Sequence, residues 1–189
     1  RFKDCPNYQH DIADVVRQTL TDSTYYLIKD IAASYEKKDM AAFKAQYTTF
    51  LGILGDLNRL LSQVGLFKLE KWTNSARNIC DEVPGTTEAD RDWMEWNART
   101  LISVWGPEKC AKQGRLHDYS SRQWGGMLGD FYLARWRMFF QALEEGRSIT
   151  SAEWFRWEEN WTHQKTITKA PKENPIDIAN ELYRKYFSE

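Results

Sequence analysis

The chain is poor in the residues that build metal centres and disulfide frameworks. It has only three cysteines, Cys5, Cys80 and Cys110, and none of them has a C-x-x-C spacing that would suggest zinc or redox chemistry. The three histidines form no Glu-x-x-His pair of the kind that holds two metal ions inside a helical bundle. We therefore expect no metal and no cofactor. At most one disulfide can form within the chain.

An excess of either charge is also missing. The 26 basic and 27 acidic residues leave a net charge of −1, whereas nucleic acids and anionic membranes bind broadly to a basic face. No apolar run approaches the roughly 20 residues that span a bilayer. No apolar stretch near the start resembles a signal peptide. These absences predict a water-soluble chain without a nucleic-acid or membrane partner. A first residue Arg1 instead of Met is consistent with a fragment or a processed product.

Prolines and strand signals are scarce. There is no sustained alternation of polar and apolar residues and no Asn-Gly or Asp-Gly hairpin signal. The few prolines fall where helical periodicity lapses: Pro6, Pro84, Pro107, Pro171 and Pro175. The pattern predicts an all-α fold, a bundle of about seven helices, in a single domain over residues 1–189.

The apolar spacing and the capping signals place these helices. The first five are expected at about 11–35, from after Asp39 to about 61, at 69–80, from Thr86 or Thr87 to about 104, and at 119–145. A capping box at Thr150 and Glu153 opens the sixth, and Asn174-Pro175 opens the last. Residues 106–116 are predicted to be a loop and 167–174 a mobile linker. The core side of the first helix is expected to hold Ile12, Val15, Val16, Leu20 and Leu27.

Three glycines lie close together within the predicted helix 119–145: Gly125, Gly126 and Gly129. Each glycine in a helix interior costs about 1 kcal/mol relative to alanine. A helix built only for stability would avoid such a cluster. It therefore predicts either a close backbone contact or a functional site.

Reactive groups are hard to identify. No G-x-S-x-G motif and no glycine-rich phosphate loop between a strand and a helix occurs. Four carboxylates flank the aromatic segments, namely Glu95, Glu108, Asp118 and Asp130, but their spacing selects no pair for glycoside hydrolysis. Asp118 has a simpler role as N-cap of the helix 119–145. Glu159 and His163, four residues apart, are more typical of a hydrogen-bonded surface pair than of a metal site.

Aromatic residues, by contrast, are abundant, at 14% of the chain and including nine tryptophans. Their flat apolar faces and polar edges suit sugar-binding clefts, although most aromatic residues at helical spacing belong to a core. Trp105 differs, because it stands at the end of a predicted helix before Gly-Pro, where its ring can project into a cleft. Tyr119 is placed similarly at a predicted helix start. These two side chains are candidates for contact with a ligand.

Two segments resemble a known family. They are D-W-M-E-W-N-A-R-T-L-I-S-V-W-G at 92–106 and L-H-D-Y-S-S-R-Q-W-G-G-M-L-G-D-F-Y-L-A-R-W-R-M-F-F at 116–140. They resemble the C-terminal helical domain of glycoside hydrolase family 89, the α-N-acetylglucosaminidases. The pattern of that family is similar to Y-E-W-N-A-R … L-W-G … L-D-Y-A-N-K-Q-W-A-G-L … Y-Y-x-P-R-W. The match is dense over about 92–143 and weaker but collinear elsewhere, including 56–61, so it covers nearly the whole chain.

The resemblance implies an enzyme that removes terminal α-linked N-acetylglucosamine from glycans with retention. It implies two catalytic glutamates in a (β/α)₈ barrel outside this chain, so no residue here is catalytic and the isolated chain is inactive. It assigns Trp105, Leu116 and Tyr119 to the wall of the substrate pocket. The implied partners are the barrel domain and a glycan ending in N-acetylglucosamine, and the implied location is secreted, periplasmic or lysosomal. The loop between Trp105 and Tyr119 is longer here than in the family pattern.

Two other functions fit the residues alone. A stand-alone helical module could dock a protein through an exposed aromatic patch. A sugar-binding module without hydrolysis could use the same aromatic rings. The sequence upstream of Arg1 would distinguish these possibilities from a domain of a larger glycosidase.

Overall fold

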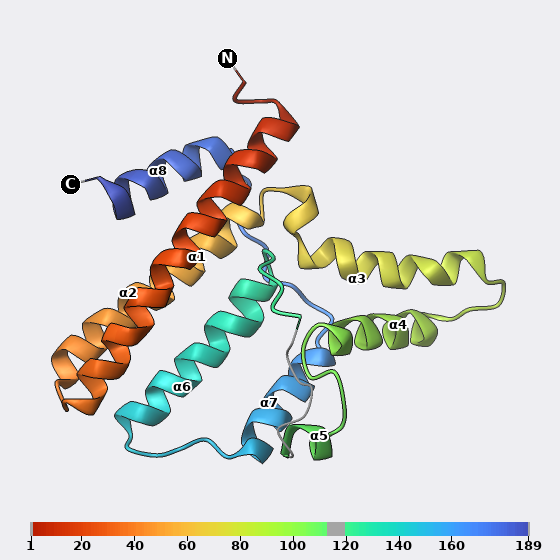
Figure 1. Ribbon diagram of the computed structural model, residues 1–189. Helices are drawn as coiled ribbons and strands as arrows, with labels where there is room; N and C mark the ends of the chain where they lie inside the picture. Colours follow the sequence, from red (N-terminus) through yellow and green to blue (C-terminus); the bar gives the residue numbers. More distant parts are fainter. Residues whose placement is uncertain (1, 113–119, 189) are drawn as a thin grey trace.

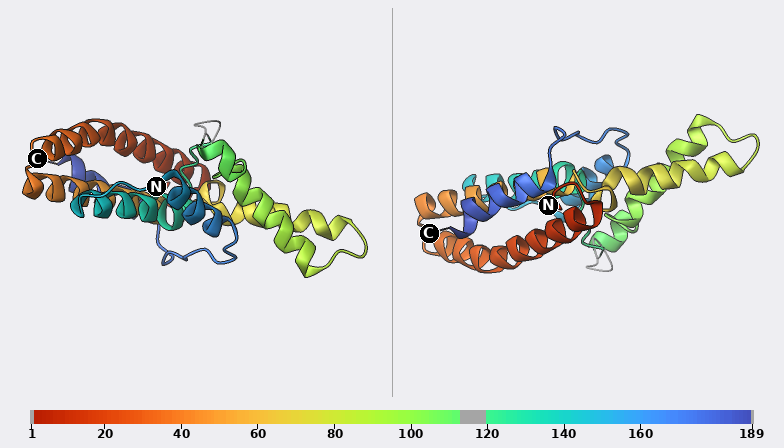
Figure 2. Two further views of the ribbon diagram at one scale, coloured as in Figure 1. Left: turned by 90° about the horizontal axis from the view of Figure 1, so that it is seen from below. Right: turned by 90° about the horizontal axis from the view of Figure 1, so that it is seen from above.

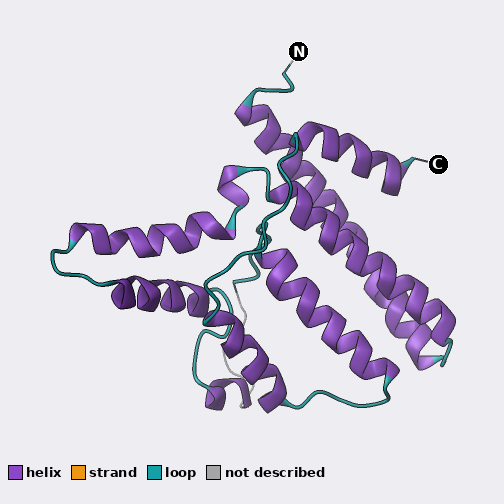
Figure 3. Ribbon diagram, turned by 180° about the vertical axis from the view of Figure 1, so that it is seen from behind, coloured by secondary structure: helices purple, strands orange, loops and turns teal. Residues whose placement is uncertain are grey.

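The computed structural model describes residues 2–112 and 120–188, and these ranges contain helices and loops but no strand (Figure 3). The seven predicted helices are present, and a short eighth lies in the predicted loop 106–116, where no helix was expected. The α-helices are α1 (Pro6–Glu36), α2 (Met40–Leu61), α3 (Leu69–Asn78), α4 (Glu88–Leu101), α5 (Glu108–Lys112), α6 (Ala134–Glu144), α7 (Ser151–Thr162) and α8 (Pro175–Phe187). Single turns of 3₁₀-helix, η1 (Gly65–Phe67) and η2 (Ile79–Glu82), flank α3, and a π-helical segment, η3 (Leu128–Leu133), leads directly into α6.

The main body is a bundle around the long pair α1 and α2, against which α6, η3 and α8 pack (Figure 1). Its core combines aliphatic side chains of α1, α2 and α8 with aromatic side chains of α2 and α6. The rings of Phe43 and Phe50 each lie edge-on to that of Phe140, at 6.0 and 5.9 Å, and the Trp136 ring packs on the Phe140 ring. These contacts explain why so many aromatic residues recur at helical spacing.

One core assignment on α1 was wrong. Val15 is 61% exposed, because the buried stripe of this helix follows Ala13, Leu20 and Ile31 at spacings of seven and eleven. Leu20 lies in that stripe as predicted. The other three predicted residues, Ile12, Val16 and Leu27, are half-buried beside it.

Helices α3 and α4 form a hairpin that extends away from the main body (Figures 1 and 2). A capping box opens α4, in which Thr87 and Asp90 exchange side-chain and backbone hydrogen bonds. The base of the hairpin joins a second apolar cluster that includes Leu69, Ile102, Phe131 and Trp161, to which α7 also contributes. The end of α4 is therefore fixed between α3 and α7.

The predicted helix 119–145 was wrong at its start. Residues 120–126 are not helical, and regular helix begins at about Leu128. The reason is a long-range pairing, in which the Gly125 amide donates to the Phe67 carbonyl at 2.7 Å and the Leu69 amide donates to the Gly125 carbonyl at 3.0 Å. Gly126 then adopts a φ of +92°, which a helix cannot contain. The proposed cap Asp118 lies outside the described residues.

The glycine cluster marks a close backbone contact, which is one of the two predicted alternatives. A methyl group on Gly125 would overlap the backbone of Ser62 at the end of α2, and one on Gly129 would lie 2.8 Å from the Asn58 side chain. Asn58 Oδ1 accepts hydrogen bonds from the amides of Gly126 and Gly129 at 2.8 and 3.0 Å. The glycines thus let the start of η3 rest directly on α2.

The connection between α7 and α8, residues 164–174, is called the strap. The sequence predicts a mobile linker at 167–174, and in the structure hydrogen bonds attach the strap to its neighbours. The Thr168 amide donates to Asp130, Gln63 bonds to the Pro171 carbonyl and the Glu173 amide, and Arg59 pairs with the Glu173 carboxylate. Polar side chains of α2, of Gln63 just after it and of η3 therefore hold the strap in place, although the strap has no regular secondary structure.

Candidate functional site

Trp105 occupies a strained turn directly after α4. The Trp105 amide donates to the Thr100 carbonyl at 2.9 Å, and the following Gly106 amide donates to Val104 at 2.6 Å. The turn gives Trp105 a φ of +61°, in the left-handed region. Ile102, Ser103 and Val104 are buried, whereas the Trp105 side chain is 37% exposed. The chain therefore brings this indole out of the interior at the end of the helix, as its sequence position predicted.

The left-handed backbone of Trp105 is unusual for a residue with such a large side chain. A left-handed conformation costs about 1 to 2 kcal/mol for a residue with a side chain, and bulky residues seldom adopt it. Gly106, the next residue, would adopt it without that cost. Strain of this kind persists where the surrounding structure over-determines it, and such sites are often functional.

The other two predicted wall residues, Leu116 and Tyr119, lie outside the described residues. The chain that follows them returns to the end of α4, because Ser120 donates a hydrogen bond to the Leu101 carbonyl at 3.3 Å. Ser120, which directly follows Tyr119 in the chain, therefore contacts the last residue of α4, four residues before Trp105 in the sequence. The assignments of Leu116 and Tyr119 stay predictions.

Two more tryptophans, neither of them predicted from the sequence as a site residue, lie beside the end of α4. Trp72 of α3 donates its indole N–H to the Ala98 carbonyl at 2.9 Å, and its ring lies 6.0 Å from that of Trp124. The Arg122 guanidinium lies 5.5 Å from the centre of the Trp124 ring. Their distance in sequence, about 50 residues, gave no signal of this contact.

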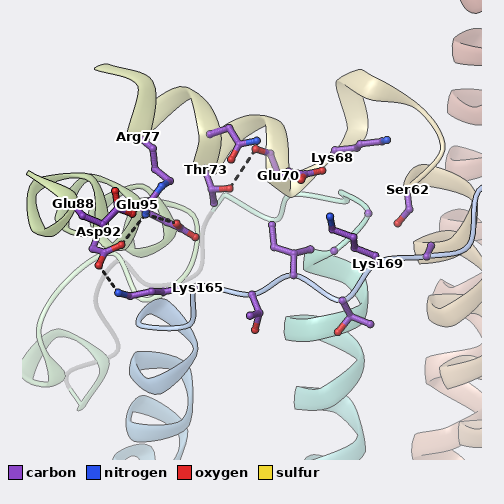
Figure 4. A pocket seen from close by; sticks show the side chains of 17 residues that line it. Ser62, Lys68, Glu70, Thr73, Arg77, Glu88, Asp92, Glu95, Lys165 and Lys169 are labelled. Carbon is purple, nitrogen blue, oxygen red and sulfur yellow. Dashed lines mark hydrogen bonds and ion pairs between the residues drawn. The ribbon is translucent and has the colours of Figure 1, made fainter. Parts of the chain in front are cut away.

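A polar groove of about 670 Å³ lies between the α3–α4 hairpin and the strap (Figure 4). Arg77 is its central cation and pairs with Asp92 at 2.8 Å, with Glu95 at 3.1 Å and with Glu88. Lys165 of the strap pairs with the other oxygen of Asp92. Lys68 and Lys169 line the opposite end of the groove.

The carboxylate of Asp92 in this groove is unsuited to acid catalysis. Hydrogen bonds from Lys165, and then from Arg77, hold the pKa of Asp92 below its ordinary value. The same contact with Asp92 raises the pKa of Arg77. A glycosidase needs one carboxyl group with a raised pKa that can donate a proton. Asp92 instead belongs to an ion-pair network that joins α3, α4 and the strap.

The remaining candidate carboxylates also have structural partners. Glu108 pairs with Lys112 at 2.8 Å, and Asp130 accepts the Thr168 amide at 2.8 Å. The His163 ring stacks on that of Trp96 at 5.5 Å. Within the described ranges, no group of three potential metal-binding side chains comes together. In that same part of the chain, no helix has the length and apolar composition needed to cross a bilayer.

The fold and the site define a class, an all-α domain with a partly exposed tryptophan in a turn. Among its described residues, the candidate carboxylates form ion pairs and hydrogen bonds with other parts of the domain. The chain belongs to the alpha-N-acetylglucosaminidase C-terminal domain family, whose sequence pattern matches residues 1–185. It is 25% identical over 192 residues to the alpha-N-acetylglucosaminidase of Homo sapiens, a match that covers 96% of this chain and 24% of that protein.

Solved structures agree. A family 89 glycoside hydrolase from Clostridium perfringens, in complex with 2-acetamido-1,2-dideoxynojirmycin, matches 95% of this chain with a TM-score of 0.82 and 28% identity. A variant of that organism's enzyme, in complex with its substrate GlcNAc-alpha-1,4-galactose, matches 99% with a TM-score of 0.85 and 29% identity. The chain spans only 21% and 22% of those two proteins, and about a quarter of the human one.

Proposed function

We propose that residues 1–189 form a single C-terminal domain of a retaining α-N-acetylglucosaminidase, which removes terminal α-linked N-acetylglucosamine from glycans. The domain supplies part of the pocket wall, and the catalytic glutamates belong to a barrel domain elsewhere in the polypeptide. The family match over residues 1–185 supports this proposal. So do the N-acetylglucosamine-type ligands named for the Clostridium perfringens relatives. A secreted, periplasmic or lysosomal location follows from the same proposal.

The observation that carries the pocket role is the position of Trp105. Its ring is partly exposed and its backbone is held at a φ of +61° at the end of α4. A pyranose ring presents apolar C–H faces, and an indole ring offers a flat surface that can cover one of them. A wall built in this way orients the sugar while another domain performs the chemistry.

The test uses the intact enzyme and a small aryl α-N-acetylglucosaminide. Trp105→Ala should lower kcat/KM by about tenfold, the equivalent of ~1.4 kcal/mol of lost contact. Trp105→Phe should retain most of the activity, because it keeps an aromatic face. Tyr26→Ala, which removes an exposed aromatic ring from α1, is the matched control and should leave the kinetics unchanged. Parental kinetics for Trp105→Ala would remove the pocket role.

The roles of Leu116 and Tyr119 are tested in the same assay. A phenol beside a sugar can pack and donate a hydrogen bond, so Tyr119→Phe should impair turnover while retaining the packing. Leu116→Ala should weaken substrate binding through lost apolar contact. The purified isolated chain should hydrolyse no such substrate, and turnover by this chain alone would contradict the assignment of the catalytic glutamates to another domain.

The α3–α4 hairpin supports a second role, as a contact surface for the rest of the same polypeptide. Its described interior is polar, with Glu95 and Thr73 buried, whereas Ile79, Val83 and Trp93 are each more than half exposed. Exposed apolar side chains on a projecting hairpin are typical of a docking surface. The relatives contain three quarters or more of their length outside the matched region, which is a sufficient partner.

If the hairpin contacts the rest of the polypeptide, a substitution of its exposed Trp93 should change stability more than substitutions at exposed positions usually do. Exposed substitutions usually change stability by less than about 0.5 kcal/mol. Trp93→Ser in the intact enzyme should exceed that limit, lower the thermal midpoint and accelerate amide exchange in the hairpin. Tyr26→Ser is the control on a different face. Equal midpoints for the two variants would show that the hairpin has no such contact.

A further inference from the structure

The last two turns of α4 contain a buried ion pair between Glu95 and Arg99. The Arg99 side chain is fully buried and that of Glu95 is 8% exposed. Arg99 Nε donates to Glu95 Oε1 at 3.0 Å, and Arg99 Nη2 lies 3.0 Å from the same oxygen. The guanidinium carbon also lies 5.0 Å from the centre of the Trp161 ring on α7.

A buried ion pair stabilises a helix end less effectively than well-packed apolar side chains often do. Among the described residues, neither Arg99 Nη1 nor Arg99 Nη2 makes a hydrogen bond, and the buried indole N–H of Trp161 makes none either. Buried donors without acceptors are costly, and replacing a buried ion pair by well-packed apolar side chains is often neutral or stabilising. Stability alone therefore does not explain the presence of a charged pair at this place.

The backbone around Arg99 shows what the pair holds. The Arg99 carbonyl accepts the Ser103 hydroxyl at 2.7 Å and the Ile102 amide at 3.2 Å. The next carbonyl, that of Thr100, accepts the Trp105 amide at 2.9 Å. The carbonyl groups of Arg99 and Thr100 therefore accept the hydrogen bonds that form the turn carrying the Trp105 ring. The buried Arg99 side chain holds this part of the backbone in place.

We propose that the Glu95–Arg99 pair is a positioning device for Trp105, which holds the end of α4 so that the indole ring meets the sugar at a fixed angle. This inference rests on the proposed function. Arg99 fixes the end of α4 against Trp161 of α7. Glu95 uses its second oxygen to accept from Arg77 of α3 at 3.1 Å. The pair thus joins α3, α4 and α7 in the last turns before Trp105, and neither residue is a catalytic residue.

The first experiment removes the pair without leaving a single buried charge. In the intact enzyme, the double variant Glu95→Gln/Arg99→Met keeps an acceptor for Arg77 and fills the arginine site with an apolar chain of similar length. Its thermal midpoint should stay close to that of the parent. Its kcat/KM should fall by about tenfold or more, because misplacement of a binding group by an ångström can cost up to about a hundredfold.

A matched control separates positioning from the general loss of an ion pair. Arg59 on α2 pairs with Glu173 on the strap at 2.8 Å. The double variant Arg59→Met/Glu173→Gln removes that pair and should leave kcat/KM unchanged. Arg99→Lys provides a second variant if the double replacement fails to fold, since lysine keeps the charge but loses the planar fork. An intermediate loss of kcat/KM is expected for it, and parental kinetics would overturn the proposal.

The decisive experiment is a double-mutant cycle with Trp105→Ala. If the pair acts only by placing the ring, Glu95→Gln/Arg99→Met should cause no further loss of kcat/KM once the ring is gone. Equal losses in both backgrounds would refute the positioning role, even where Trp105→Ala itself is damaging. Parental kinetics for Trp105→Ala alone would instead refute the pocket role, and the inference with it.

Discussion

The backbone of Gly125 lies directly against Ser62, so that any side chain at position 125 would overlap the end of α2. Gly125→Ala should therefore destabilise the protein by about 1 to 3 kcal/mol, the usual cost of overpacking. The matched control is Gly55→Ala, since Gly55 lies inside α2 with no atom within 4 Å of the added methyl group. That change should stabilise by about 0.5 to 1 kcal/mol. Urea unfolding of both variants checks the difference, and equal free energies would contradict it.

Asn58 is the second half of the same contact. Its Oδ1 accepts hydrogen bonds from the Gly126 and Gly129 amides. Both amides lie at the start of η3, where the first N–H groups of a helix have no acceptor within the helix. Asn58→Leu should lower the free energy of unfolding by about 2 kcal/mol, because it leaves two partly buried N–H groups without acceptors. Asn58→Asp keeps the acceptor oxygen and should cost less. A smaller loss for leucine than for aspartate would refute this account.

Local signals were sufficient to predict most of the helices. The capping box at Thr150 and the Asn174-Pro175 start lie where expected, and Thr87 is the N-cap of α4, one of the two residues predicted for that role. The non-helical path of residues 120–126 could not be predicted, because the backbone bonds of Gly125 go to Phe67 and Leu69, more than 50 residues away. A periodic apolar pattern contains no information about such pairing. The glycines indicated a close contact, but not which element made it.

The site was predictable only in part, for the same reason. Trp105 stood out because it precedes Gly-Pro at a helix end. The Arg77–Glu95–Arg99 network did not, because alternating charges along a helix are usually a solvated surface. Glu95 and Arg99 do have the i, i+4 spacing of an ion pair. Their burial, however, depends on α3 and α7 closing over them, which the sequence of α4 alone cannot show.

The contacts of Asp92 predict a dependence of stability on pH. Lys165 and then Arg77 lower the pKa of Asp92 in the folded state below its ordinary value of 3.8. A lowered pKa stabilises the folded protein at pH values above about 4, and this contribution is lost as the pH falls through the folded-state pKa. Asp92→Asn should therefore destabilise at neutral pH and converge with the parent in acid. Urea unfolding across this pH range measures the difference.

Lys165 offers the complementary change. Lys165→Met removes the first partner of Asp92, so it should reduce the same acid-sensitive contribution. In the double variant with Asp92→Asn the two losses should be less than additive, because both changes break one contact. A constant stability difference between Asp92→Asn and the parent at every pH would contradict the assignment.

Lys38 and Trp105 share a φ of 61°, but the two residues have different surroundings. Lys38 is an exposed residue just after α1, where its amide donates to the Tyr35 carbonyl and glycine is the usual choice. Lys38→Gly should therefore stabilise the protein by about 1 kcal/mol. Trp105→Gly relieves the same strain but removes the ring, so unfolding should show little loss of stability while kcat/KM of the intact enzyme falls by about tenfold. If Trp105→Gly kept parental turnover, the strain at this turn would have no connection with substrate binding, and Lys38 and Trp105 would be equivalent turns.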